Sequence, residues 1–122
     1  MKVLLDNCID IRVKRLFAGH EVTHARDLGW RDLENGRLLT AAANAGFAVM
    51  CTVDKNIRYQ QNLSVLPLSI IELNVVRSRF VDIAQLAPFL ATALEHAMTY
   101  RFVSVATDGR IEVLAARGPG HG

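Results

Sequence analysis

Lys2–Asp6 reads Lys-Val-Leu-Leu-Asp, and this stretch is the starting point for predicting the fold. A short apolar run without alternation of polar and apolar residues is typical of a strand buried on both faces, as in a parallel sheet covered by helices. The stretch Phe47–Asp54, Phe-Ala-Val-Met-Cys-Thr-Val-Asp, repeats this pattern. Because parallel strands present their carboxyl ends at the same edge of a sheet, Asp6 and Asp54 converge there if the two strands are neighbours.

The segment after the first strand is ambiguous. Alternating Ile and Val residues in Cys8–Phe17 fit a strand, but the apolar residues also fall on one helical face. We predict a helix capped by Asn7, because a crossover must connect two parallel neighbours. His20–His24 is a weaker strand with few apolar residues, which indicates a place nearer an edge of the sheet, and Ala25–Leu33 is a connection.

Four further elements are expected in the rest of the parallel body. They are a helix from its cap Asn35 to Ala45, a helical turn or short helix within Lys55–Asn62, a strand at Pro67–Leu73, and a helix that runs from the capping box Asp82/Gln85 to Met98. Pro88 lies inside the last helix and is expected to kink or restart it. The predicted fold class is therefore α/β with a mostly parallel sheet.

The C-terminal part follows a different pattern. Phe102–Ala106 and Ile111–Ala115 flank Thr107–Arg110, whose Asp-Gly pair is a strong signal for a hairpin turn. We therefore expect an antiparallel hairpin, residues 101–115, to end a single domain of residues 1–116. Residues 117–122 are rich in Gly and Pro and are expected to form a flexible tail.

The composition is typical of one globular domain. The chain has 122 residues, of which 51% are hydrophobic and 21% charged, and its formal net charge of +2 does not by itself indicate a nucleic-acid binder. Cys8 and Cys51 are too few for a disulfide framework or a zinc site, and we expect both to be buried reduced thiols. Asp6 interrupts the apolar start, so no signal peptide is expected, and Ile83–Leu94 is too short to span a bilayer. The sequence therefore predicts a cytoplasmic protein.

Asp6 and Asp54 are the leading candidates for chemistry. Two carboxylates at one sheet edge can bind Mg²⁺ or Mn²⁺, which would activate a bound water and neutralise charge on a scissile phosphate. Alternatively, each acid only caps the helix that follows its strand. The four histidines do not form a catalytic set, and no Ser or Cys has an evident partner base.

Several motifs occur together in a fixed order. They are Lys2–Asp6, Gly-His-Glu-Val at Gly19–Val22, Leu-Gly-Trp at Leu28–Trp30, Glu-Asn-Gly-Arg-Leu-Leu at Glu34–Leu39, Thr-Val-Asp-Lys-Asn at Thr52–Asn56, and Tyr-Gln-Gln-Asn at Tyr59–Asn62. In this order and spacing the chain resembles, from about Met1 to Met98, the small PIN-like proteins, which are relatives of the PilT N-terminus. That resemblance implies a three-layer α/β/α sandwich, Mg²⁺- or Mn²⁺-dependent cleavage of RNA, and a toxin role beside a small antitoxin protein.

The resemblance also implies roles for individual residues. Asp6 and Asp54 match the acids that follow the first strand and a later strand of the family, and they would bind the metal. Glu34 is the closest candidate for a further acid, and Asn56 takes the place of the second acid of an Asp-x-Asp pair. Asn7 stands where many relatives have Glu; an amide oxygen can ligate a hard cation but brings no charge. We therefore expect Asp6, Asp54, Glu34 and Asn56 to form the catalytic site.

Substrate contacts are expected beside these acids. Lys55 and Arg58 follow Asp54 closely and are the best candidates for phosphate contacts. Asn7 is expected to add a polar contact. Tyr59 and Gln60 either stack on and hydrogen-bond a base, or pack and cap locally, and the sequence favours neither interpretation.

These expectations describe a metal-dependent ribonuclease of PIN-like type, the toxin of a toxin–antitoxin pair. The alternative is a PIN-like module without catalysis that binds RNA or protein, for which Asn7 and Asn56 are the evidence. A nucleotide-binding regulator is a weaker idea, because no Gly-rich phosphate loop follows Lys2–Asp6. A homodimer formed through the hairpin or the last helix is a further hypothesis.

Overall fold

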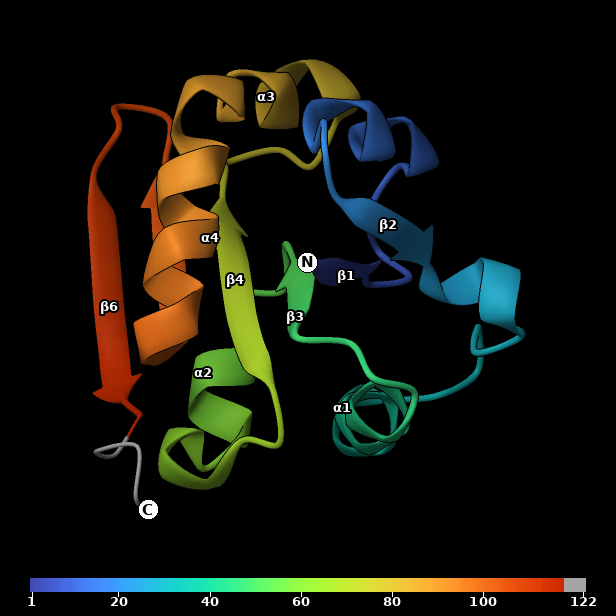
Figure 1. Cartoon of the computed structure of the whole chain (residues 1–122). Coiled ribbons are helices and arrows are strands. Elements are labelled where there is room, and N and C mark those ends of the chain that lie inside the picture. The colour runs from blue at the N-terminus through green and yellow to red at the C-terminus, as the bar shows by residue number, and fades with distance from the viewer. Residues whose placement is uncertain (118–122) are drawn as a thin grey trace.

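The computed structural model of the chain describes residues 1–117. Within this range six strands form a sheet in the order β2-β1-β3-β4-β5-β6 (Figure 1). The strands are β1 (Lys2–Leu5), β2 (Glu21–His24), β3 (Val49–Thr52), β4 (Ser69–Asn74), β5 (Tyr100–Ala106) and β6 (Ile111–Ala116). The first five pair in parallel, and β6 pairs antiparallel with β5. The predicted α/β fold with a C-terminal hairpin is therefore confirmed, and β2 lies at an edge as expected. Residues 118–122 of the predicted tail lie outside the described residues.

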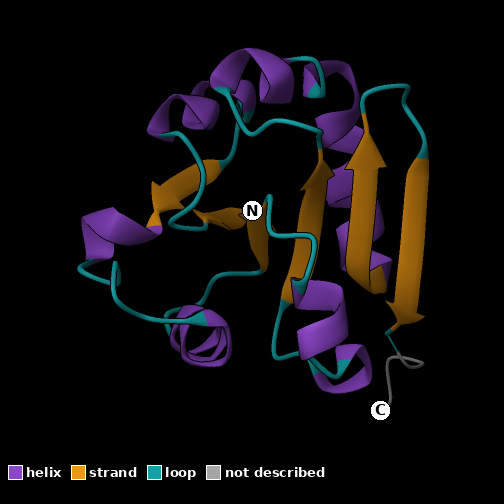
Figure 2. Cartoon of the chain, turned by 180° about the vertical axis from the view of Figure 1, so that it is seen from behind, coloured by secondary structure: helices purple, strands orange, loops and turns teal. Residues whose placement is uncertain are grey.

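Helices connect the parallel strands. The α-helices are α1 (Asn35–Asn44), α2 (Ile57–Gln60), α3 (Phe80–Ala84) and α4 (Leu90–Thr99), and the 3₁₀ helices are η1 (Ile11–Leu16), η2 (Ala25–Leu28), η3 (Leu63–Val65) and η4 (Ala87–Phe89). Helix α4 lies in front of the sheet in Figure 1 and behind it in Figure 2, which gives the opposite view. In the described part of the chain, no helix is long and apolar enough to cross a membrane.

Alternation along the strands creates an apolar layer on each face of the sheet. Val3 and Leu5 are buried on the face that η1, α3 and α4 cover. Leu4 and Met50 are buried on the opposite face, together with apolar side chains of α1 and α2. The central strands are thus covered on both faces, which explains why Lys2–Asp6 is apolar without alternation.

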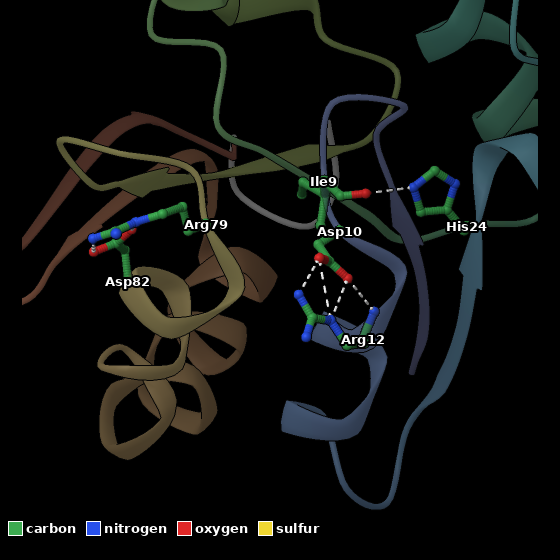
Figure 3. A network of polar contacts seen from close by, with 6 residues as sticks. All are labelled: Ile9, Asp10, Arg12, His24, Arg79 and Asp82. Carbon is green, nitrogen blue, oxygen red and sulfur yellow. Dashed lines mark hydrogen bonds and ion pairs between the residues drawn. The ribbon is translucent and has the colours of Figure 1, made fainter.

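The first crossover differs from the prediction in both its type and its cap. It is the 3₁₀ helix η1, and Asp10 caps it by accepting a hydrogen bond from the backbone N of Arg12 (2.9 Å). The Arg12 side chain binds the same carboxylate at 2.7 Å and lowers the pKa of Asp10 to about 2 (Figure 3). The predicted cap Asn7 is wrong, because its amide is bound to a distant loop instead.

Two other predicted caps are also wrong. Glu34, not Asn35, precedes α1, and it makes no capping hydrogen bond with its side chain. Arg79, not Asp82, precedes α3, and the Asp82 carboxylate accepts a hydrogen bond from Arg79 Nε at 2.7 Å (Figure 3). Pro88 restarts the helix, since it lies in η4 directly before α4. Proline at the start of a helix removes no intrahelical hydrogen bond.

The hairpin turn packs closely against the body of the protein. Gly109 adopts φ +88°, which favours glycine because it has no side chain to clash. A Cβ atom at Gly109 would lie 2.9 Å from Cε1 of Phe89 in η4. The Asp-Gly signal in the sequence therefore has two physical causes, the left-handed backbone and the close contact with Phe89.

Candidate active site at the carboxyl edge of the sheet

Strands β1 and β3 are parallel neighbours, with Leu5 opposite Cys51 in their register. The backbone N of Asp6 extends this pairing by donating to the carbonyl oxygen of Cys51 at 2.9 Å. Asp6 and Asp54 consequently line one cavity of about 650 Å³, which we call the acid cavity. Its lining residues are Asp6, Asn7, Cys8, Arg31, Leu33, Glu34, Asn35, Gly36, Val53, Asp54 and Gln60.

Asp6 is buried, with 7% of its surface exposed, and hydrogen bonds hold both of its oxygens. Oδ1 accepts from the backbone N of Asn7 at 2.7 Å. Oδ2 accepts from Oγ1 of Thr52 at 2.8 Å and from Sγ of Cys8 at 3.5 Å. These donors fix the position of the carboxylate at the wall of the cavity.

Thr52 connects the two aspartates, and the sequence analysis missed it. Its buried hydroxyl donates to Asp6 and accepts from the backbone N of Asp54 at 3.0 Å. One hydroxyl therefore fixes the ends of both strands relative to each other. A Thr two residues before an acid, at the last position of a strand, was the available signal.

We expect Thr52→Val to lower the free energy of unfolding by about 1–3 kcal/mol. The substitution preserves side-chain volume, but it leaves the Asp54 N–H without its partner and leaves Asp6 Oδ2 with only the long contact from Cys8. Chemical denaturation measures the loss of stability. Hydrogen exchange provides a local test, since the Asp54 amide should exchange faster in Thr52→Val and stay protected in Thr52→Ser. Equal protection of Asp54 in the two variants would contradict the assigned hydrogen bond.

Asp54 is partly exposed and faces the cavity from the loop after β3. Its Oδ1 accepts from the backbone N of Asn56 at 2.9 Å, so this acid also supports the turn into α2. Asn56 itself is exposed and is not among the residues that line the acid cavity. Of the four predicted catalytic residues, the structure brings Asp6, Asp54 and Glu34 to the cavity and leaves Asn56 beside it.

The ends of two helices line the acid cavity. Glu34 precedes α1, and Gln60 ends α2. The Nδ2 atom of Asn35 donates to Oε1 of Gln60 at 2.7 Å, which joins the start of α1 to the end of α2. Polar groups at the ends of these helices therefore line the same cavity as the two aspartates.

Asn7 fixes a loop rather than presenting its amide to the cavity. Its Nδ2 atom donates to the carbonyl oxygens of Trp30 (3.0 Å) and Arg31 (3.3 Å). Its Oδ1 atom is buried and accepts no hydrogen bond from the described residues. This link brings Arg31, which the sequence analysis did not select, to the acid cavity.

Three of the other predicted substrate contacts, Lys55, Arg58 and Tyr59, do not line the acid cavity. Arg58 points towards β4 and β6, where its Nη2 atom is 3.2 Å from Glu72 Oε1 and 2.8 Å from Glu112 Oε1. Lys55 is exposed, and Tyr59 has 81% of its surface exposed. Among the residues predicted beside Asp54, the structure brings Gln60 to the cavity.

The two cysteines have different environments. Cys51 is buried as predicted, and burial raises the pKa of its thiol. The prediction that Cys8 is buried is wrong, because it lies at the open cavity and is exposed. Its sulfur nevertheless points inward, and desolvation together with the Asp6 carboxylate raises the pKa of the Cys8 thiol. The neutral thiol therefore acts as a donor to Asp6.

The donor atoms of the site suit a hard cation. Asp6 and Asp54 offer carboxylate oxygens at one cavity wall, and Mg²⁺ binds through one or two carboxylates while it keeps several waters. Within residues 1–117, no three His, Cys, Asp or Glu side chains are grouped so that they could hold a metal ion. Any hard cation that Asp6 and Asp54 held would therefore need water to complete its coordination.

Comparisons of the chain with family models, with curated proteins and with solved structures find no match.

Proposed function

We propose that the protein is a metal-dependent ribonuclease of PIN-like type and the toxin of a toxin–antitoxin pair. The observation that supports this most directly is the convergence of Asp6 and Asp54 from neighbouring parallel strands on one cavity, with Glu34 at its mouth. The order of motifs along the sequence supports the family. Open access to the cavity suits a phosphodiester of RNA.

Each residue of the acid cavity has a distinct task in this proposal. The carboxylates of Asp6 and Asp54 hold Mg²⁺ or Mn²⁺, and Thr52 keeps these two acids in register. When bound, the metal lowers the pKa of a coordinated water and offsets negative charge on the scissile phosphate. Glu34, which is exposed at the mouth, can accept a proton from the attacking water.

The second candidate function is a PIN-like module that binds RNA or protein without cleavage. It is favoured by the two positions where amides replace acids, since Asn7 is bound to a loop and Asn56 lies outside the cavity. Calorimetric titration with Mn²⁺ in the presence of a nucleotide separates the two functions. Detectable binding supports the nuclease, and its absence supports the binding module.

The partners and location follow from the same proposal. We expect a small antitoxin protein to cover the toxin, and a homodimer to form through β6 or α4, because β6 is an edge strand with unpaired backbone groups. Cys8 and Cys51 are free thiols, which suits the reducing cytoplasm.

The deciding experiment is cleavage of a labelled RNA by the purified protein. We expect cleavage with Mn²⁺ and none with EDTA. The double variant Asp6→Asn/Asp54→Asn, purified in parallel, reports any contaminating nuclease, and Glu95→Gln on α4 is the matched control for loss of a carboxylate on an exposed helix. Equal cleavage by the wild type and the double variant would end the assignment.

A further inference from the structure

A second, smaller cavity adjoins the acid cavity. It has a volume of about 350 Å³ and is lined by Asn7, Ile9, Asp10, Ile11, His24, Arg26 and Arg31. We call it the arginine hollow. Asn7 and Arg31 line both cavities. A polymeric ligand that fills the acid cavity can therefore continue past Arg31 into the arginine hollow.

Hydrogen bonds tie together the wall of the arginine hollow. Nε2 of the buried His24 ring donates a hydrogen bond of 2.7 Å to the carbonyl oxygen of Ile9 (Figure 3). Its Nδ1 atom accepts from the backbone N of Arg26 at 3.1 Å. The Asn7 amide fixes the carbonyl group of Arg31 from the other side. The backbones that carry both arginines are therefore held in place before any ligand binds, which lowers the entropic cost of binding.

The charges in the two cavities differ in sign. Asp10 is paired with Arg12 at 2.7 Å, and Arg26 also attracts its carboxylate, so Asp10 offsets part of the charge of Arg26 but forms no ion pair with Arg31. Arg26 has a long contact of 4.0 Å with Asp27, and both side chains are about half exposed. In the described part of the chain, Arg31 makes no ion pair. The hollow thus carries positive charge without an equal partner, next to the acids.

We infer that Arg31, with Arg26 behind it, binds an RNA phosphate adjacent to the one at the acid cavity. This inference rests on the proposed function. A guanidinium group presents paired N–H donors that match phosphate oxygens, and a strand places its phosphates at regular intervals. Arg58, by contrast, is already bound to two carboxylates. The ligand is thus an oligonucleotide that spans both cavities, which implies cleavage within a strand.

Binding measured without cleavage tests the inference. The probe is a fluorescent single-stranded RNA of about eight nucleotides, and EDTA prevents hydrolysis. We expect Arg31→Gln to weaken binding about five- to tenfold and to reduce the slope of log K against log salt by about 0.7, the value for one phosphate contact on a single strand. Arg31→Lys should retain most of the binding. Arg110→Gln removes an equal charge at the distant hairpin turn and should change binding less than about twofold.

The outcomes separate this inference from the proposed hydrolysis. RNA binding that depends on Arg31, in a protein that never cleaves with Mn²⁺, supports the inference and refutes the nuclease. Cleavage with Mn²⁺ by a protein whose RNA affinity is the same in Arg31→Gln refutes the inference alone. The inference is also overturned if the wild type does not bind RNA in EDTA. Displacement of the RNA by oligo-glutamate at equal charge concentration overturns it as well, in favour of an acidic protein partner.

Discussion

Asp6→Asn is expected to reduce metal-dependent RNA cleavage by about 10²–10⁴-fold, because losing a carboxylate ligand weakens binding of a metal that supplies several kcal/mol of charge stabilisation. The substitution preserves side-chain shape, and one oxygen remains to accept from Thr52 or from the backbone N of Asn7. We therefore expect a stability change of only about 1 kcal/mol. Initial cleavage rates with Mn²⁺, measured beside thermal unfolding, separate the loss of activity from a loss of fold.

The control for Asp6→Asn is Glu95→Gln, which removes a carboxylate from the exposed surface of α4 and should cleave like the wild type. Raising the Mn²⁺ concentration should restore part of the activity of Asp6→Asn, because Asp54 still offers a ligand at the same cavity. A variant that keeps more than about half of the wild-type rate would contradict a metal-binding role for Asp6.

The sequence was sufficient to predict the architecture because local and global signals agree. Two apolar runs without alternation required a sheet buried on both faces, and both runs end on an acid. The sequence left open whether these two runs are neighbours in the sheet, and the parallel pairing of β1 and β3 in the structure meets that condition and brings Asp6 and Asp54 to one edge. The hairpin followed from the Asp-Gly pair at its turn.

The caps and the basic side of the site were not predictable in the same way. Asn7 has the residue type of an N-cap, but the loop after η2 returns to β1 and takes its amide. Arg31 reaches the acid cavity through that same contact, which joins residues 24 positions apart. Arg58 follows Asp54 closely in sequence, yet it turns towards Glu72, a partner on another strand. Each of these outcomes depends on tertiary contacts that have no local pattern.

The second large effect concerns the ion pair of Arg58. Glu72 is 3% exposed, and its Oε1 atom accepts from Arg58 Nη2 (3.2 Å) and Ser104 Oγ (2.8 Å). The guanidinium also lies 4.9 Å from the centre of the Phe102 ring. Arg58→Met keeps the apolar stem but leaves the Glu72 carboxylate buried without a cation. We expect it to lower the free energy of unfolding by about 3–5 kcal/mol, measured by chemical denaturation at neutral pH.

Two comparisons show whether the buried charge causes that loss. Arg79→Met breaks the ion pair between Arg79 and Asp82. Because the Arg79 side chain is 60% exposed, this variant should lower the free energy of unfolding by less than about 1 kcal/mol. Arg58→Met/Glu72→Gln removes both charges and should recover more than half of the loss, because the neutral amide is cheaper to bury and can still accept from Ser104. If Arg58→Met lowers the free energy of unfolding no more than Arg79→Met does, Glu72 must reach water or another cation. Arg58 would then be free to contact a phosphate.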